Sequence, residues 1–235
     1  MKATVSEKRE VAEGTLMVVF DLGGEHVDFR PGQYFWVELP SRGYEDEKGL
    51  RRHISVVTSP TERGVLGLAT RLRDSAFKRT LAELESGDEV DVEEPKGKFL
   101  LPEDSNRRYV FVAGGIGITV FRSMLRYVAD QGLPHRITLV YSNRNRASAA
   151  FLDELSELEQ QIEGLTVVLT MTDEPEWGGE TRHIDERLLR DHLGEDLEAY
   201  TYLVAGPPGM AESVGDMLKA VVPEEQVTVD KFSGY

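Results

Sequence analysis

The sequence predicts a protein of two domains: a small antiparallel β-barrel or sandwich, then an α/β domain on a parallel sheet. Three observations predict this. The first hundred residues hold short apolar and β-branched runs bounded by glycine, proline and charged residues. After Pro102, apolar strands alternate with amphipathic helices. A polar stretch between them, 102–107, is typical of a linker. We therefore expect one domain over 1–102 and another over 107–235.

The N-terminal half is expected to form short strands around one short helix. The turn signals Pro31-Gly32 and Ser86-Gly87-Asp88 separate the strands. A helix is expected over 75–84. Several short strands at this spacing are typical of a barrel or sandwich. The ranges expected as strands are 15–20, 34–39, 54–58, 65–72 and 89–92.

The C-terminal half alternates between the two kinds of element. Near-continuous apolar strands followed by helices indicate a parallel sheet covered on both faces. Strands are expected over 109–113, 137–141, 166–170, 200–205 and 226–229. Helices are expected over 119–129, 149–161, 185–193 and 209–221.

The composition excludes several classes of site. The chain has no cysteine, so it carries no disulfide, thiolate nucleophile, cysteine-bound zinc or iron–sulfur cluster, which fits a reducing cytoplasm. Its five histidines lack metal-binding spacing, and we expect no metal. No apolar run approaches the length of a membrane span. The net charge of −15 argues against nucleic acid as a partner.

One segment departs from this negative charge. Residues 51–79 contain seven basic and two acidic residues, within a chain that is strongly acidic overall. Such a basic island is typical of a site for an anionic ligand. The alternative is a set of exposed charges on strands and a helix.

A glycine-rich loop follows the first strand of the second half. The run Gly114-Gly115-Ile116-Gly117 connects that strand to the helix that begins near Thr119. Glycines allow close approach to a phosphate, and a helix N-terminus offers N–H groups and partial positive charge. Thr119 is expected to cap the helix or bind a phosphate oxygen. The alternative is a turn that only packs the helix on the strand. No lysine follows the glycines, which excludes the P-loop of a nucleoside triphosphatase.

The second and fourth strands of this half end in further candidate residues. The second strand ends at Ser142, followed by Arg144 and Arg146, with no acid present. An arginine here accommodates the 2′-phosphate of NADPH, whereas an acid binds the ribose of NADH. The two arginines are alternatively exposed loop charges. The fourth strand runs into Gly206-Pro207-Pro208-Gly209-Met210, which is expected to face the same crevice as the glycine loop.

These motifs, in this order, resemble the ferredoxin-NADP reductase superfamily over essentially the whole chain. The matching segments are Arg30-Pro31-Gly32-Gln33-Tyr34, Arg52-His53-Ile54-Ser55, residues 114–119, residues 205–210, Glu176-Trp177 with the Gly-Gly after it, and the ending 230–235. The resemblance implies an N-terminal FAD-binding β-barrel and a C-terminal NAD(P)-binding α/β domain. The implied cofactors are FAD and NADP, or NAD.

The resemblance also implies roles for individual residues. Arg52 would pair with the FAD pyrophosphate, and Ser55 would lie near the flavin atom that receives hydride. Ser75 and Lys78 stand where the family has a second phosphate loop, and Tyr235 or Phe232 would cover the flavin. The implied catalytic residues are Ser55, Asp230 and Tyr235. The implied cofactor-binding residues are Arg52, His53, Ile54, Ser55, Ser75, Lys78, Gly114, Gly115, Gly117, Thr119, Ser142, Arg144, Gly206, Pro207, Met210, Phe232 and Tyr235.

The chain departs from the family pattern at several positions. Ile54 stands where an aromatic side chain often stacks on the flavin, and Val120 replaces a proline at the start of the helix. Ala205 replaces a cysteine beside the nicotinamide, which puts the rate of hydride transfer in doubt. Asp230 is one carbon shorter than the usual glutamate.

The expected function is therefore a cytoplasmic, FAD-dependent NAD(P)H oxidoreductase. It would take hydride from a nicotinamide dinucleotide and deliver electrons to an acceptor such as ferredoxin, flavodoxin or another redox partner with its own cluster or flavin. Free flavin, a quinone and an oxygenase partner also stay open as acceptors. Three alternatives stay open: a non-catalytic flavin and nucleotide sensor, the electron-transfer subunit of a larger complex, and a phosphate-binding α/β enzyme without flavin.

Overall fold

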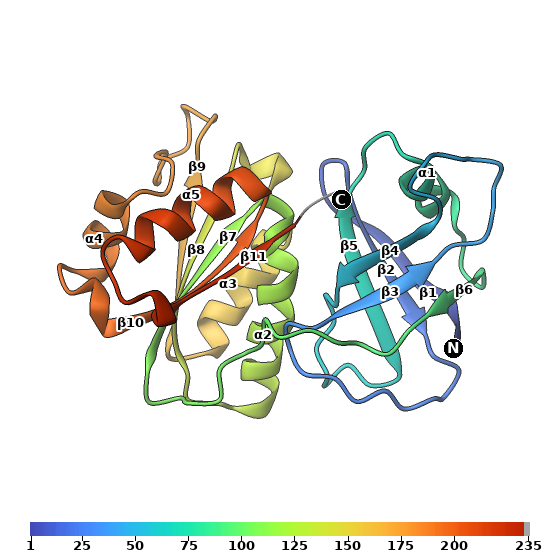
Figure 1. The fold of residues 1–235 in the computed structure, drawn as a ribbon, viewed down its shortest axis with the longest axis horizontal. Coiled ribbons are helices and arrows are strands. Elements are labelled where there is room, and N and C mark those ends of the chain that lie inside the picture. Colours follow the sequence, from blue (N-terminus) through green and yellow to red (C-terminus); the bar gives the residue numbers. More distant parts are fainter. Residues whose placement is uncertain (233–235) are drawn as a thin grey trace.

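The computed structural model describes residues 1–232, and its N-terminal half is a six-stranded antiparallel sheet (Figure 1). Its order is β4-β3-β6-β1-β2-β5. Just beyond β4 the Val57 N–H donates to the Gly67 carbonyl at 2.9 Å, which joins the two edges of the sheet and curls it toward a barrel. The strands are β1 (Lys2–Ala12), β2 (Thr15–Asp21), β3 (Tyr34–Glu38), β4 (Arg51–Ser55), β5 (Val65–Arg71) and β6 (Glu89–Val92).

The sheet encloses its own apolar core, and α1 (Ala76–Glu83) contributes to it. Phe77 and Leu81 of α1 pack with Phe20, Phe35 and other buried side chains of the strands. Ser75 caps this helix, because its Oγ accepts a hydrogen bond from the Lys78 N–H at 3.3 Å. The helix therefore begins and ends within one residue of the expected range.

Two predictions for this half were wrong. β1 was not expected, because residues 6–10 of this strand are polar and exposed and only Ala3 and Val5 of it are buried in the core. The fourth strand was expected over 54–58 but spans Arg51–Ser55. The apolar residues just after it are buried: Val56 packs in the core of the first domain, and Val57 belongs to the cluster around α2.

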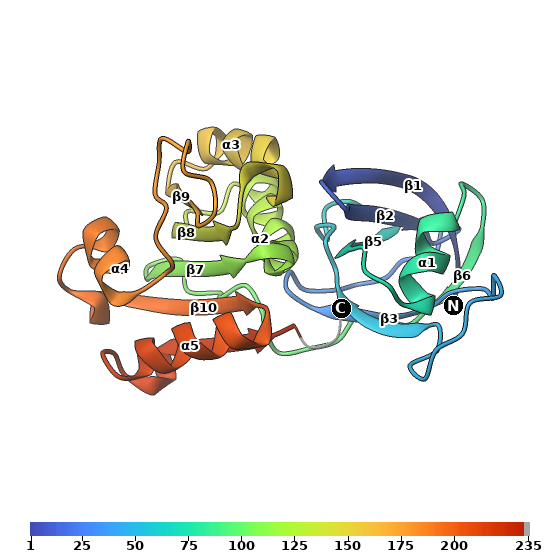
Figure 2. The ribbon, with the colours of Figure 1, turned by 90° about the horizontal axis from the view of Figure 1, so that it is seen from above.

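The C-terminal half is a five-stranded parallel sheet of order β11-β10-β7-β8-β9 with helices on both faces (Figure 2). Its strands are β7 (Arg108–Gly114), β8 (Arg136–Asn143), β9 (Leu165–Met171), β10 (Tyr200–Gly206) and β11 (Val227–Lys231). Its helices are α2 (Ile118–Gln131), α3 (Leu152–Gln161), α4 (Glu186–Leu193) and α5 (Pro208–Lys219).

Successive side chains along each strand point to opposite faces of the sheet, so this half has two apolar cores, one on each face. Phe111 of β7 packs against α2 and α3, whereas Val110 and Val112 pack against α4 and α5. The predicted two-domain fold class, with its doubly covered parallel sheet, is confirmed. One boundary was wrong: α3 was expected from residue 149 but begins at Leu152, because Phe151 adopts a left-handed conformation with φ of 65°.

The core around α2 continues into the first domain. Met17, Val57 and Ala69 of the N-terminal half belong to the same apolar cluster as Phe121 and Leu125 of α2. The connection between β6 and β7 also packs here, with the Phe99 ring 5.9 Å from that of Phe121. The domain division at 102–107 lies within this connection and is kept as a proposal. No helix within residues 1–232 is long and apolar enough to cross a membrane.

Candidate functional site

Two loops meet at the carboxyl ends of the neighbouring strands β7 and β10. The first is the glycine loop, residues 114–119, and the second is residues 205–210. A Cβ on Gly206 would lie 3.1 Å from the backbone nitrogen of Gly114, and one on Gly114 would lie 3.0 Å from the Met210 sulfur. The loops therefore lie side by side, in the crevice where open parallel sheets bind their ligands.

The glycines of the first loop have different structural roles. A Cβ on Gly117 would lie only 2.3 Å from the Ala205 carbonyl oxygen, so Gly117 allows α2 to pack on β10. Gly115 has a φ of 49°, and a Cβ there would meet only the Arg71 guanidinium, at 3.9 Å. It lines a cavity of about 200 Å³ with Arg71, Arg73, Ile116, Pro207, Pro208 and Phe232. Of the three glycines, Gly115 has the space that a phosphate needs.

Thr119 does not cap α2. The loop turns through a short 3-10 helix over Gly115–Gly117, so α2 begins at Ile118 and Thr119 already lies inside it. Its hydroxyl donates to the Ile116 carbonyl at 3.0 Å, and its side chain is buried. The capping role predicted for Thr119 is wrong. A phosphate contact from this hydroxyl stays a prediction.

A second cavity, of about 250 Å³, lies against the first domain. It brings together four predicted residues, Arg52, Ile54, Ser75 and Lys78, which come from β4 and from the start of α1. Lys48, Thr70, Arg73, Asp74 and Phe77 complete its lining. Since side chains on a helix tilt toward its N-terminus, Lys78 in the first turn of α1 points back toward the residues before the helix. The basic island thus contains one defined cavity.

Lys78 is the most unusual group in this cavity. Its side chain is only 6% exposed, and its ammonium nitrogen has no hydrogen-bond partner among the described residues. Burial, together with the charges of Arg73 and Arg52, lowers the pKa of Lys78 to about 8. A buried and unpaired ammonium destabilises a protein. An anion in the cavity would remove this penalty, and the pyrophosphate of FAD fits that requirement.

The loop before β4 holds Arg52 at the edge of the same cavity. The Arg52 guanidinium donates to the carbonyl oxygens of Lys48 at 2.6 Å and Gly49 at 3.0 Å. Asp46 ties this loop to α1, because its carboxylate accepts from the Ala76 N–H at 2.7 Å, and this bond keeps its pKa below the usual value. Asp46 and Lys48 were not predicted, since only the folded loop brings them to the cavity.

Two of the predicted catalytic residues, Ser55 and Asp230, lie near the domain boundary. Ser55 and Ile54, at the end of β4, are buried, while His53 is exposed and its ring lies 5.0 Å from that of Trp36. Burial raises the pKa of Asp230 on β11, and the charge of His53 partly opposes this shift. The two side chains therefore interact electrostatically across the boundary. Tyr235 lies outside the described residues.

The end of β8 carries the residues predicted to bind the adenosine half of the nucleotide. Ser142 is half-buried and Arg144 is exposed. Arg146 is held by Glu174, whose carboxylate accepts from its Nε and its backbone N–H, both at 2.7 Å. These bonds, the backbone one first, keep the pKa of Glu174 below the usual value. An acid from the loop after β9 is thus bonded to Arg146 beside the end of β8.

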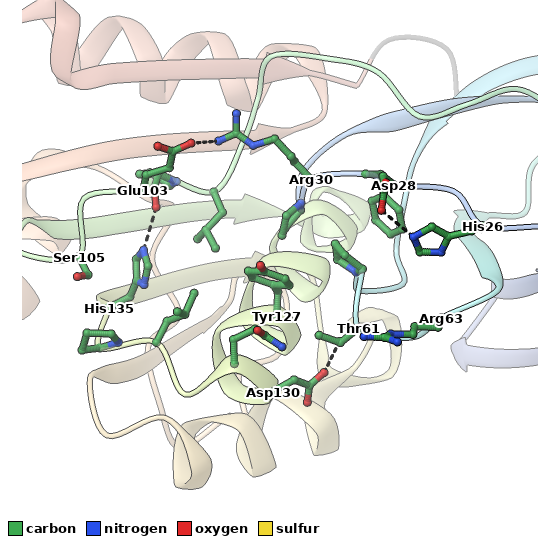
Figure 3. Close-up of a pocket in the computed structure, with 18 residues that line it drawn as sticks. His26, Asp28, Arg30, Thr61, Arg63, Glu103, Ser105, Tyr127, Asp130 and His135 are labelled. Carbon is green, nitrogen blue, oxygen red and sulfur yellow. Dashed lines mark hydrogen bonds and ion pairs between the residues drawn. The ribbon is translucent and has the colours of Figure 1, made fainter.

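A larger cavity lies elsewhere. It has a volume of about 980 Å³, and it lies between the domains at the C-terminal end of α2 (Figure 3). Its polar lining is paired internally, by Arg30 with Glu103 and by Thr61 with Asp130. It contains none of the predicted site residues, so size alone does not identify the site in this protein.

Two family models match separate parts of the chain. Residues 2–100 match the oxidoreductase FAD-binding domain, and residues 111–216 match the oxidoreductase NAD-binding domain. Groups of three or more residues suited to a metal ion are absent from the described part of the chain.

Relatives match along most of the chain. One component of the Na⁺-translocating NADH-quinone reductase of Neisseria meningitidis is 26% identical over 90% of this chain and 62% of its own length. Methane monooxygenase component C of Methylosinus trichosporium is 33% identical over 73% of this chain and 49% of its own. This chain thus spans about half to two thirds of the length of these relatives.

Solved structures share the fold. The flavohem-like FAD/NAD-binding domain of nitric oxide dioxygenase from Vibrio cholerae has a TM-score of 0.86 at 21% identity and covers 98% of both chains. The cytochrome P450 reductase GcoB of Amycolatopsis has a TM-score of 0.84 at 24% identity, over 99% of this chain and 70% of that one.

Proposed function

Because this chain belongs to the ferredoxin-NADP reductase superfamily, we propose that it takes hydride from a nicotinamide dinucleotide onto FAD and delivers electrons to a redox protein. When bound, FAD supplies the chemistry, since it accepts hydride and releases electrons one or two at a time. The protein supplies binding, orientation and electrostatics. The observation that carries the proposal is the unpaired, buried ammonium of Lys78 in a cationic cavity.

Each part of the site has a distinct task in this proposal. Lys78, Arg52 and Ser75 hold the FAD pyrophosphate by charge and hydrogen bonds. Ser55 and Ile54, at the end of β4, would flank the flavin ring, and the Ser55 hydroxyl would donate a hydrogen bond to it.

The second domain holds the nucleotide. Gly115 admits its pyrophosphate to the cavity that Arg71 and Phe232 share, and Ser142 contacts its adenosine half. Gly114, Gly117, Gly206, Pro207 and Met210 shape this crevice by packing the two loops together. Asp230 lies at the nicotinamide end, where its half-buried carboxyl interacts with His53 of the other domain.

The acceptor is proposed to be a protein with its own iron–sulfur cluster or haem. This chain has no cysteine, so a cluster has to be carried by another domain or by a partner. The names of the relatives include a component of methane monooxygenase and a cytochrome P450 reductase. Release of the protein into the cytoplasmic fraction on gentle lysis would support the cytoplasmic location that we propose.

The test is a spectrum of the purified protein with added FAD, followed by anaerobic mixing with NADH or NADPH. Bound flavin that is bleached by either nucleotide supports the proposal. Flavin that binds but stays oxidised with both nucleotides would indicate a sensor module. A protein that stays colourless with added FAD would refute flavin binding altogether.

The choice of nucleotide is expected to depend on Arg144 and Glu174. Arg144→Ala should lower kcat/KM for NADPH about tenfold, as for loss of one charge-assisted hydrogen bond, and change that for NADH little. Glu174→Gln should release Arg146 and raise the NADPH to NADH ratio. The measurement is the ratio of kcat/KM for the two nucleotides.

The matched control is Glu176→Gln, which neutralises an exposed acid two residues away. It should leave the ratio unchanged. An unchanged ratio in Arg144→Ala would remove Arg144 from the nucleotide site.

A further inference from the structure

Two adjacent side chains of α2 bind the backbone of the other domain. Arg122 donates from Nη1 to the Val57 carbonyl at 2.7 Å, and Ser123 donates from Oγ to the Thr58 carbonyl at 2.7 Å. Arg122 is 5% exposed and Ser123 is fully buried. These bonds cross the domain boundary in the interior of the protein, where water does not compete for them.

Two carboxylates also pair with the Arg122 guanidinium. Nη1 lies 3.1 Å from Glu62 of the first domain, and Nε lies 2.9 Å from Glu154 of α3. Burial alone would lower the pKa of Arg122, but the two carboxylates outweigh it and raise the pKa. The planar guanidinium fixes the geometry of all three partners, which a lysine would not do.

Phe151 supports the same group. Its ring lies under the Arg122 guanidinium at 5.6 Å, and it is the one described residue other than glycine with a positive φ, at 65°. Such a conformation is costly for an aromatic residue and persists only where the surroundings enforce it. Strain and a buried charge therefore coincide at this point of the boundary.

This contact joins the two halves of the proposed site. Val57 lies two residues after Ser55, and its N–H is fixed in turn to Gly67 of β5. At the other end, α2 begins directly at the glycine loop. Arg122 is four residues into the helix, or roughly 6 Å along its axis. The first turns of α2 thus connect the nucleotide loop to the segment just after β4, the strand that carries Ser55.

We propose that Arg122, assisted by Ser123, is a positioning residue that sets how closely the nicotinamide approaches the flavin. This inference rests on the proposed function. Arg122 acts through the backbone of residues 57–58 and is not a catalytic residue. Hydride transfer is sensitive to such placement, because a displacement of about 1 Å can slow a reaction roughly a hundredfold.

The test compares Arg122→Lys and Ser123→Ala with the wild-type protein. In single-turnover mixing with NADH, we expect flavin reduction to slow about 10- to 100-fold in Arg122→Lys and less in Ser123→Ala. A primary isotope effect with deuterated NADH should persist, and the dissociation constants of FAD and nucleotide should stay close to the wild-type values. Amide hydrogen exchange over residues 56–62 should quicken in the FAD-free protein.

Asp130→Ala is the matched control. It removes the hydrogen bond from Thr61, which joins the same helix to the same segment at the far end (Figure 3). This variant should exchange faster at Thr61 but reduce flavin at the wild-type rate. If Arg122→Lys does not fold, Ser123→Ala, which loses a single hydrogen bond, decides the question with the same measurements.

The outcomes separate the two proposals. Variants that are less heat-stable but reduce flavin as fast as wild type, with unchanged exchange over 56–62, would overturn the positioning role alone. Wild-type protein that binds FAD and is reduced by neither nucleotide would overturn the proposed function, and the positioning role with it.

Discussion

Lys78→Met is expected to weaken FAD binding about 10- to 100-fold and, at the same time, to stabilise the FAD-free protein. The affinity falls because a charge-assisted hydrogen bond to phosphate, worth about 1.5–3 kcal/mol, is lost. The stability rises because the variant no longer buries an unpaired ammonium. Methionine keeps most of the volume of the side chain. FAD titration and thermal unfolding of the FAD-free protein measure the two effects.

The pH dependence provides a second measurement of the same group. The pKa of Lys78 is about 8 in the folded protein, against 10.5 for an ordinary lysine. Below pH 8 the side chain is charged and FAD affinity should be constant, whereas above pH 8 the affinity should fall. Between about pH 8 and 10.5 the unfolded chain binds more protons than the folded one, so the contribution of Lys78 to stability improves as the pH rises. Lys78→Met should lack both changes.

Lys98→Met is the control for general charge effects, because Lys98 is exposed and lies outside the cavity. It should alter neither affinity nor stability appreciably. If Lys78→Met bound FAD as tightly as wild type, the pyrophosphate would have to lie outside this cavity.

Gly117→Ala is expected to destabilise the protein by about 3 kcal/mol, at the upper end of the usual range for overpacking, and to abolish nucleotide binding. The added methyl group would lie 2.3 Å from the carbonyl oxygen and 2.6 Å from the carbonyl carbon of Ala205. That backbone is hydrogen-bonded within β10 to both β7 and β11, so it cannot move aside cheaply. Thermal unfolding and nucleotide titration measure the result.

Gly115→Ala is the matched comparison within the same loop. It meets no atom closer than 3.9 Å, so its main cost is the left-handed backbone, about 1–2 kcal/mol. We expect a folded protein that binds nucleotide weakly, because the methyl group enters the cavity. Equal stability of the two variants would contradict the distinct roles given to these glycines.

Local patterns were sufficient to predict most of the fold. The strands of the parallel sheet are apolar on both faces and bounded by helices, so sequence located all five within two residues at each end. β1 was not predicted from the sequence, because about half of its side chains are exposed and most of these are charged, which weakens the apolar pattern of a strand. The start of α3 could not be predicted, because Phe151 packs against Arg122 of α2, which no local pattern around residue 151 signals.

The site was predictable where it depends on motifs and not where it depends on tertiary contacts. The cavity that holds Arg52, Ser75 and Lys78 joins segments that the family resemblance had already connected. The pairing of Glu174 with Arg146 depends on how the loops after β8 and β9 fold together. The contacts of Arg122 cross 65 residues of sequence, and no local pattern signals them.

The hydrogen bonds from α2 to residues 57–58 limit which nucleotide domains can be exchanged between related proteins. Consider a chimaera that joins this flavin domain to a foreign nucleotide domain at a point within the connection between β6 and β7. In that protein, residues 57–62 would pack against a foreign helix whose side chains do not match them. The buried carbonyls of Val57 and Thr58 would then lose these donors, and Glu62 would lose its arginine partner. Grafts that carry Arg122, Ser123, Phe151 and Glu154 along with the foreign sheet should couple the two cofactors, and grafts that omit them should yield folded halves that exchange electrons poorly.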